Sequence, residues 1–311
     1  MEIIELKPED YDSIFNKPYH IFNTATFNDL NKYKCDEVKY LAFKDTKYRL
    51  GFIGGVRNNL LISPFSAPFG GFSFVKGDIQ IAQIENAVSH LEQYAIDKGL
   101  DGIQVALPPL FYNETFLAKL INTLYRNNYA IANLDLDFYM NLENMDNYSE
   151  KIWYNAKKNL QIASQQDFEF EVCNNDDEKI KEVYQIIAEN RISRDKPLNM
   201  SYSDVINTSR VVPTDFFLLS KDGHGIASAI VFHVNDTTAY VPFWGDRPGF
   251  LNLKPMNFIS FKTFEYYKSI SKKHVHIGIS TESSVPNYGL CEFKESLGCT
   301  ITPKFTFKKL F

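Results

Sequence analysis

The chain has 311 residues, 44% of them hydrophobic and 23% charged, which suffices for two domains of ordinary size without disulfide or metal staples. The formal net charge of −5 argues against a polyanion or an anionic membrane as the main partner. Residues 1–5 are acidic, and no apolar run reaches the roughly 20 residues of a membrane helix, so we expect neither a secretory leader nor membrane insertion. The cysteines form no CxxC pair, which favours free thiols in a reducing cytoplasm and no metal site: Cys35, Cys173, Cys291 and Cys299.

The first half of the chain predicts three strands, a loop, and then alternating helix and strand. Apolar residues recur with 3-4 spacing from Ile81 to Ala95, as on the buried face of a helix, and Lys98-Gly99 provides its end. Asn58-Asn59 is a turn between two strands. The predicted elements, in chain order, are residues 38–44, 50–57, 60–65, the Gly/Pro loop 66–72, 81–98, 102–107, a helix after residue 113, and 129–139.

The second half predicts the same order again. Its elements are residues 215–220, 226–234, 238–244, the Gly/Pro loop 245–249, 255–272, 275–280, 287–297 and 300–307. Because turn residues and loops also fall in register, we predict an internal duplication. The fold class is therefore α+β, with two mixed, mostly antiparallel sheets flanked by helices, and the polar run 143–148 is the expected linker between them.

The order of elements in each half resembles the GNAT acyltransferase fold. The last helix of that family commonly reads N-x-x-A-x-x-x-Y-x-x-x-G-F, and here Asn287 and Gly298 match while Lys294 stands at the tyrosine and Cys299 at the phenylalanine. Two such halves, with the pair Phe293-Lys294 and the basic segment 153–160, resemble the Fem-type (FemAB-like) transferases, although their coiled-coil arm has no counterpart. The resemblance implies two tandem GNAT-like domains: residues 1–145, degenerate and on the acceptor side, and residues 146–311, the catalytic half.

Three residues are candidates for catalysis. Acyl transfer needs a group that stabilises negative charge on the carbonyl oxygen, and the family match proposes Lys294 for that role. Asp246 and Glu282 each follow an apolar strand, where loops shape sites, so either would accept a proton from the amine or bind its ammonium form. The alternatives are an ordinary solvated helix lysine, and turn or capping carboxylates.

Substrate binding is assigned to side chains around the same elements. GNAT enzymes usually bind the pyrophosphate of coenzyme A in a glycine-rich loop, but here Pro248 removes an N–H and no second glycine follows Gly249, so acyl-CoA stays open as a donor. Asn287 is also explained as a helix N-cap. The assigned residues are Trp244, Arg247, Lys254, Asn287, Tyr288, Phe293, and the basic pair Arg191 and Arg194.

The sequence thus predicts a cytoplasmic N-acyltransferase that moves an acyl or aminoacyl group from an activated donor to a primary amine by direct displacement. The acceptor would be a small-molecule amine, or an amino-sugar or peptide. One alternative is Fem-like transfer from aminoacyl-tRNA to a cell-wall precursor, which the acidic balance makes less attractive. The other is a binding module with a GNAT fold and no activity, since duplicated halves often keep a degenerate site.

Overall fold

The computed structural model describes residues 1–311, which divide into two compact units. The first unit comprises Met1–Leu136, Glu282–Val285 and Thr302–Phe311. The second comprises Asp137–Thr281 and Pro286–Ile301. Both units are therefore built from segments that are distant in the sequence.

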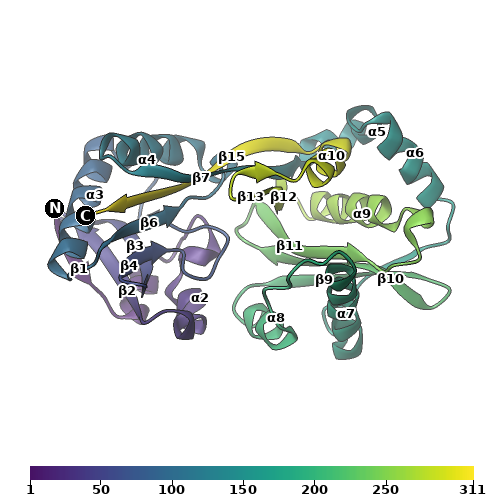
Figure 1. Cartoon of the computed structure of the whole chain (residues 1–311), viewed down its shortest axis with the longest axis horizontal. Helices are drawn as coiled ribbons and strands as arrows, with labels where there is room; N and C mark the ends of the chain where they lie inside the picture. Colours follow the sequence, from purple (N-terminus) through teal and green to yellow (C-terminus); the bar gives the residue numbers. More distant parts are fainter. The chain divides into compact units, whose positions relative to one another are not determined.

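The first unit is a sheet with helices on both faces (Figure 1). Its strands are β1 (Glu2–Glu5), β2 (Glu37–Lys44), β3 (Tyr48–Arg57), β4 (Leu60–Ser63), β5 (Phe72–Phe74), β6 (Gly102–Ala106) and β15 (Thr300–Leu310). Its helices are α1 (Pro8–Ile14), α2 (Ala25–Leu30), α3 (Ile81–Asp97) and α4 (Glu114–Arg126). The strand order is β1-β2-β3-β4-β6-β15, with β5 on β3. The strands β4 and β6 are parallel. The pairs β1–β2, β2–β3, β3–β4, β3–β5 and β6–β15 are antiparallel.

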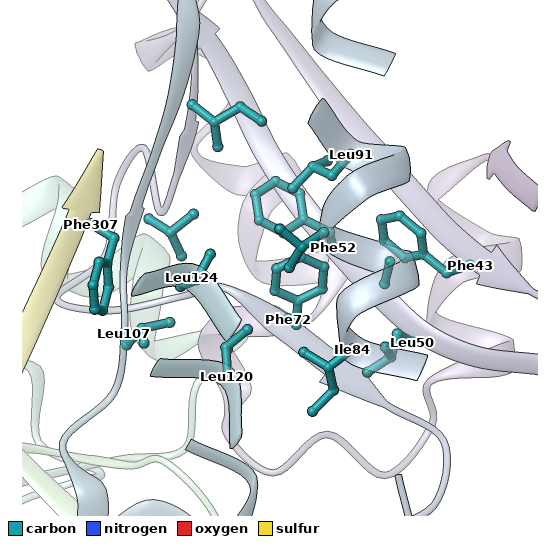
Figure 2. Close-up of a cluster of buried hydrophobic side chains, with 14 of the residues drawn as sticks. Phe43, Leu50, Phe52, Phe72, Ile84, Leu91, Leu107, Leu120, Leu124 and Phe307 are labelled. Carbon is teal, nitrogen blue, oxygen red and sulfur yellow. The ribbon is translucent and has the colours of Figure 1, made fainter. Parts of the chain in front are cut away.

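The core of this unit lies between the sheet and the helices α3 and α4. Ile84 and Leu91, from the 3-4 pattern of α3, meet the sheet residues Phe43 and Phe52 with almost no exposed surface (Figure 2). Each such side chain contributes roughly 1.5–3 kcal/mol by leaving water. Phe307 of β15 belongs to the same cluster, so the C-terminal strand is part of the first unit's core.

The second unit repeats the arrangement with a sheet between α7 and α9 (Figure 1). Its strands are β7 (Ala130–Asn141), of which residues 137–141 belong here, β8 (Glu169–Val172), β9 (Thr214–Lys221), β10 (His224–His233), β11 (Thr238–Asp246) and β12 (His274–Ile279). Its helices are α5 (Tyr148–Lys151), α6 (Tyr154–Ala163), α7 (Asp177–Ser193), α8 (Tyr202–Ser209), α9 (Pro255–Ser269) and α10 (Tyr288–Ser296). The order is β7-β12-β11-β10-β9-β8, and β11 and β12 are parallel. A small hairpin, β13 (Thr281–Glu282) with β14 (Val285–Pro286), precedes α10.

The predicted repeat is confirmed as an order of elements. The first half reads β2-β3-β4-α3-β6-α4-β7, and the second reads β9-β10-β11-α9-β12-α10-β15. Each half also has one parallel strand pair at the equivalent place, β4 with β6 and β11 with β12. The predicted α+β class, with mixed and mostly antiparallel sheets flanked by helices, is what the structure has.

The strand that ends each half, however, pairs in the other half's sheet. The strand β15 pairs antiparallel with β6 of the first unit, and the end of β7 pairs antiparallel with β12 of the second. The sequence assigned each closing strand to its own half, because a strand's hydrophobic pattern does not name its partner. The two units therefore differ from the contiguous division at residue 145.

The polar run 143–148 is not an extended linker. It lies largely in a 3₁₀ helix, Leu142–Asn147, that packs in the second unit. Leu142 and Tyr148 are buried, the Tyr148 ring lies 5.3 Å from that of Phe261, and Leu142 N–H donates to Lys273 O at 2.9 Å. The burial of these two side chains at its ends fixes a segment whose polar composition is typical of a loop.

Candidate functional site

The parallel strands β11 and β12 separate at their carboxyl ends. They pair only at Thr238↔His274, Ala239↔Val275 and Tyr240↔His276. Beyond that point β11 continues to Asp246 without β12, while the end of β12 pairs with β7. Side chains and loops at diverging strand ends are free of ladder pairing and are available for a ligand.

A bulge at the end of β12 is the central backbone feature. The register with β7 shifts between His276 and Gly278, and Gly278 has a φ of +73°. A residue with a Cβ is strained in that region, which explains the glycine. The two successive carbonyls of Gly278 and Ile279 both accept from Lys294 Nζ, at 2.7 and 3.0 Å.

Lys294 of α10 is buried, with 2% of its surface exposed, so the alternative of a solvated surface lysine is wrong. Burial lowers the pKa of its ammonium to about 8, and Asp137 opposes that shift. The Phe138 ring centroid lies 5.1 Å from Nζ. Since an ammonium has three N–H donors and two are taken by carbonyls, the third remains for another acceptor.

A buried acid–histidine pair lies at the same end of the sheet. His276 Nε2–H donates to Asp137 Oδ1 at 2.7 Å, and each side chain is 1% exposed. The centroid of the Tyr240 ring of β11 lies 4.7 Å from that of the His276 ring, and the two ring planes are tilted by 41°. Burial raises the pKa of the Tyr240 phenol, Asp137 raises it further, and Arg191 lowers it, so these groups share one electrostatic environment.

Asp246, at the end of β11, is held by α7. It is 3% exposed, and Asn190 Nδ2 donates to its Oδ1 at 2.9 Å and to its carbonyl at 2.8 Å. Gly245 permits this approach, because a Cβ there would lie 2.8 Å from Asn190 Cβ. Burial raises the pKa of the Asp246 carboxyl, although Arg194, whose Nη2 is 3.5 Å from Oδ1, opposes that shift. Asp246 is thus a buried acid with a raised proton affinity, the type found at functional sites.

The end of α7 carries a cation without a carboxylate partner. Arg191 Nε is buried and has no hydrogen-bond partner. Burial lowers the pKa of Arg191, and the neighbouring charge of Arg194 lowers it further. Because Arg191 also lowers the pKa of Lys294, the two cations lie within electrostatic range of each other. A substrate anion would offset both charges.

An aromatic pair and a capped helix complete the region. The rings of Trp244 and Phe293 lie 6.4 Å apart, and both residues are partly exposed. Asn287 is the N-cap of α10, because its Oδ1 accepts from Leu290 N–H at 3.1 Å. Tyr288 is 79% exposed in the first turn of the same helix.

The other predicted residues are not gathered around Lys294. Glu282 is exposed and belongs to the first unit. Arg247 is engaged by Glu189 at 2.9 Å and Glu182 at 3.1 Å, and so is not a free phosphate ligand. Lys254 has a left-handed φ of +59° and serves as the N-cap position of α9 without a side-chain cap.

Several backbone positions before α9 cannot donate to a ligand. The N–H groups of Arg247, Leu253 and Lys254 donate to carbonyls of the chain, at 2.8, 2.9 and 3.2 Å. Pro255, the first helical residue, has no N–H. These backbone positions are therefore not available as donors in a phosphate nest.

The equivalent place in the first unit is filled by its own chain. Gly70 N–H donates to Ala106 O at 2.8 Å and Gly71 N–H to Ser63 Oγ at 3.0 Å, so these glycines are not a phosphate cradle. Phe69 and His20 are fully buried beside them, with ring centroids 5.0 Å apart. Burial lowers the pKa of His20 to about 3, which keeps its ring neutral.

Sequence reasoning missed four residues of the second unit's site: Asp137, Asn190, His276 and Gly278. None of the four belongs to a recognisable motif. Their only signal was a charged or special residue inside an apolar strand or helix pattern, as in residues 135–137 and 274–278. No group of three or more histidine, cysteine or carboxylate side chains lies together as metal ligands would.

Known structures share this fold. FemX matches with a TM-score of 0.73 at 10% identity, over 100% of this chain and 98% of its own. L-PGS from Bacillus licheniformis matches with a TM-score of 0.63 at 12% identity, over 97% and 92%. A tandem GNAT protein from the clavulanic acid biosynthesis pathway matches with 0.54 at 7% identity, over 99% and 98%. No protein-family model and no curated protein matches the sequence. The chain thus has a tandem GNAT fold similar to that of FemX.

None of its helices combines the length and the apolar composition that crossing a bilayer requires.

Proposed function

We propose that the chain is an N-acyltransferase that moves an acyl or aminoacyl group from an activated donor onto a primary amine, with the chemistry in the second unit. The observation that carries the proposal is Lys294. It is a buried ammonium fixed by two carbonyls of a glycine bulge, with one N–H left over, at the place where β11 and β12 diverge. A charge held in this way is preorganised for an oxyanion.

The reaction is a direct displacement. The neutral amine attacks the donor carbonyl, and the third N–H of Lys294 donates to the oxygen as it gains negative charge. The bond to the donor's leaving group then breaks, and the nitrogen gives up one proton. Asp246, a buried acid with a raised pKa, is the proposed carrier of that proton to the leaving group.

The donor side is proposed around α7 and α10. Arg191, with Arg194, would bind an anionic part of the substrate, and the Trp244–Phe293 pair would pack against its apolar part. Acyl-CoA remains a proposed donor, and we expect side chains to bind part of its phosphates because the N–H groups of Arg247, Leu253 and Lys254 are occupied. The first unit is proposed as a degenerate half, since its own Phe69 and Gly70-Gly71 fill the equivalent place.

Fem-like transfer from aminoacyl-tRNA to a cell-wall precursor is the second proposal. It is supported by a basic surface on α5 and α6, where Lys151, Lys157 and Lys158 are exposed.

The experiment offers the purified chain a panel of acyl-CoA thioesters and charged tRNAs together with primary amines, and detects amide products by mass spectrometry. Product formation that Lys294→Met abolishes supports the enzyme, and loss of product after RNase treatment assigns it to the tRNA donor. A folded chain that transfers nothing from any donor would contradict the proposal and favour the alternative of a binding module without activity.

A further inference from the structure

The buried carboxylate Asp137 is satisfied on one side only. Its Oδ1 accepts twice, from His276 Nε2–H at 2.7 Å and from the N–H of Phe138 at 2.8 Å. Its Oδ2 is buried and has no hydrogen-bond partner at all. A buried carboxylate oxygen without a hydrogen bond destabilises the fold by roughly 1–3 kcal/mol or more. A ligand that donates a hydrogen bond to Oδ2 would remove that cost.

The position of Asp137 relates it to the reaction site. It lies on β7 opposite Ile279, whose carbonyl accepts from Lys294. The bulge at Gly278 therefore serves both groups: it directs two carbonyls to the lysine and lies next to Asp137 on the paired strand. Asp137 also raises the pKa of Lys294, so the carboxylate and the ammonium feel each other's charge.

The surrounding charges select the form of the ligand. The carboxylate of Asp137 carries one negative charge, and the cations Lys294 and Arg191 outnumber it in the same environment. Lys294 already offsets that negative charge, so a further ammonium would add a third positive charge and is disfavoured. A neutral primary amine suffers no such repulsion and still has N–H groups to donate. Only a neutral amine is a nucleophile, so this environment favours the reactive form of the acceptor.

We propose that Asp137 Oδ2 binds the primary amine of the acceptor by accepting one of its N–H bonds, with His276 holding the other carboxylate oxygen in place. The ligand class is a neutral primary alkylamine. Asp137 is then the amine-binding residue, and His276 is its positioning residue. This inference rests on the proposed function, since it names where the acceptor of that reaction binds.

The test uses n-butylamine as the probe and n-butanol as its matched control, with the ¹⁵N signals of the His276 imidazole as the reporter. In the unaltered chain, butylamine should shift the Nε2 signal in a saturable manner at pH values where it is partly neutral, and butanol should not. Asp137→Asn should remove the response. Asp215→Asn is the matched control, because Asp215 is another buried carboxylate bonded to a histidine but has both oxygens occupied, and it should respond as the unaltered chain does.

The second readout is the partition between aminolysis and hydrolysis of whichever donor is turned over. Losing one hydrogen bond to the acceptor should lower aminolysis about tenfold or more in Asp137→Asn, with donor hydrolysis retained. Unchanged His276 signals in the unaltered chain with butylamine, or unchanged partition in Asp137→Asn, would overturn the inference. Amine binding without transfer from any donor would instead contradict the proposed function and support the amine-binding site.

Discussion

Replacing Lys294 with methionine separates a catalytic charge from a structural one. A pKa lowered from the ordinary 10.5 to about 8 corresponds to about 3 kcal/mol against the charged side chain in the folded chain. Methionine removes that cost and keeps most of the buried length. It also leaves the carbonyls of Gly278 and Ile279 without this donor, at roughly 1–3 kcal/mol each. Because the two effects oppose each other, we expect the free energy of unfolding to change by less than about 3 kcal/mol.

The rate should respond very differently. Loss of one preorganised donor to an oxyanion costs a factor of ~10²–10³ in kcat. Lys294→Arg should recover only part of the rate, because a planar guanidinium does not reproduce a compact ammonium between two carbonyls. The assays are denaturant unfolding and single-turnover transfer with the donor found by screening.

The matched control is Leu297→Ala on the turn that follows α10. Leu297 is 1% exposed, so its truncation should cost roughly 2–5 kcal/mol of stability with little specific effect on the chemical rate. The reasoning fails if Lys294→Met transfers at the full rate. It also fails if Lys294→Met loses as much stability as Leu297→Ala, since the lysine would then be a structural residue.

Three further predictions concern the same unit. Lys294 must be protonated to stabilise an oxyanion, so the transfer rate should fall as pH rises through about 8, and Lys294→Arg should lack this falling limb; a pH–rate profile checks both. Gly278→Ala forces a φ of +73° on a residue with a Cβ, which should cost roughly 1–2 kcal/mol and lower kcat by displacing the lysine's carbonyls, as unfolding and kinetics would show; an unchanged rate would separate the bulge from the site. Burial alone would raise the pKa of Asp215, but hydrogen bonds from His233, Tyr267 and Asn174 hold it below its ordinary value. Its folded-state pKa being the lower one, Asp215 should stabilise the fold above the ordinary carboxyl pKa of about 4 and lose that contribution as pH falls through the lowered value. Acid unfolding of Asp215→Asn should therefore show a weaker dependence on pH, and an unchanged dependence would contradict the assignment.

Local sequence determined the elements and their order. The 3-4 spacing of α3 and the turn at Asn58-Asn59 are encoded within a few residues, because helix periodicity and turn chemistry depend on neighbours along the chain. The repeated order also followed from local signals. Lys294 was identified from a family motif, and its catalytic role stays a prediction; the structure shows that its side chain is buried and bonded to a backbone carbonyl.

Tertiary structure decided which strands pair and which polar groups meet. Nothing in the pattern of β15 states that it pairs with β6, or that the end of β7 pairs with β12, because an apolar strand fits many partners and register arises from the whole sheet. Asp137 and His276 are 139 positions apart in the sequence, so only that pairing brings their side chains to 2.7 Å. For the same reason the sequence predicted Arg247 as a phosphate ligand. In the structure its guanidinium instead forms ion pairs with Glu182 and Glu189 of α7. The site is a product of long-range contacts, and those are the interactions that composition and spacing do not carry.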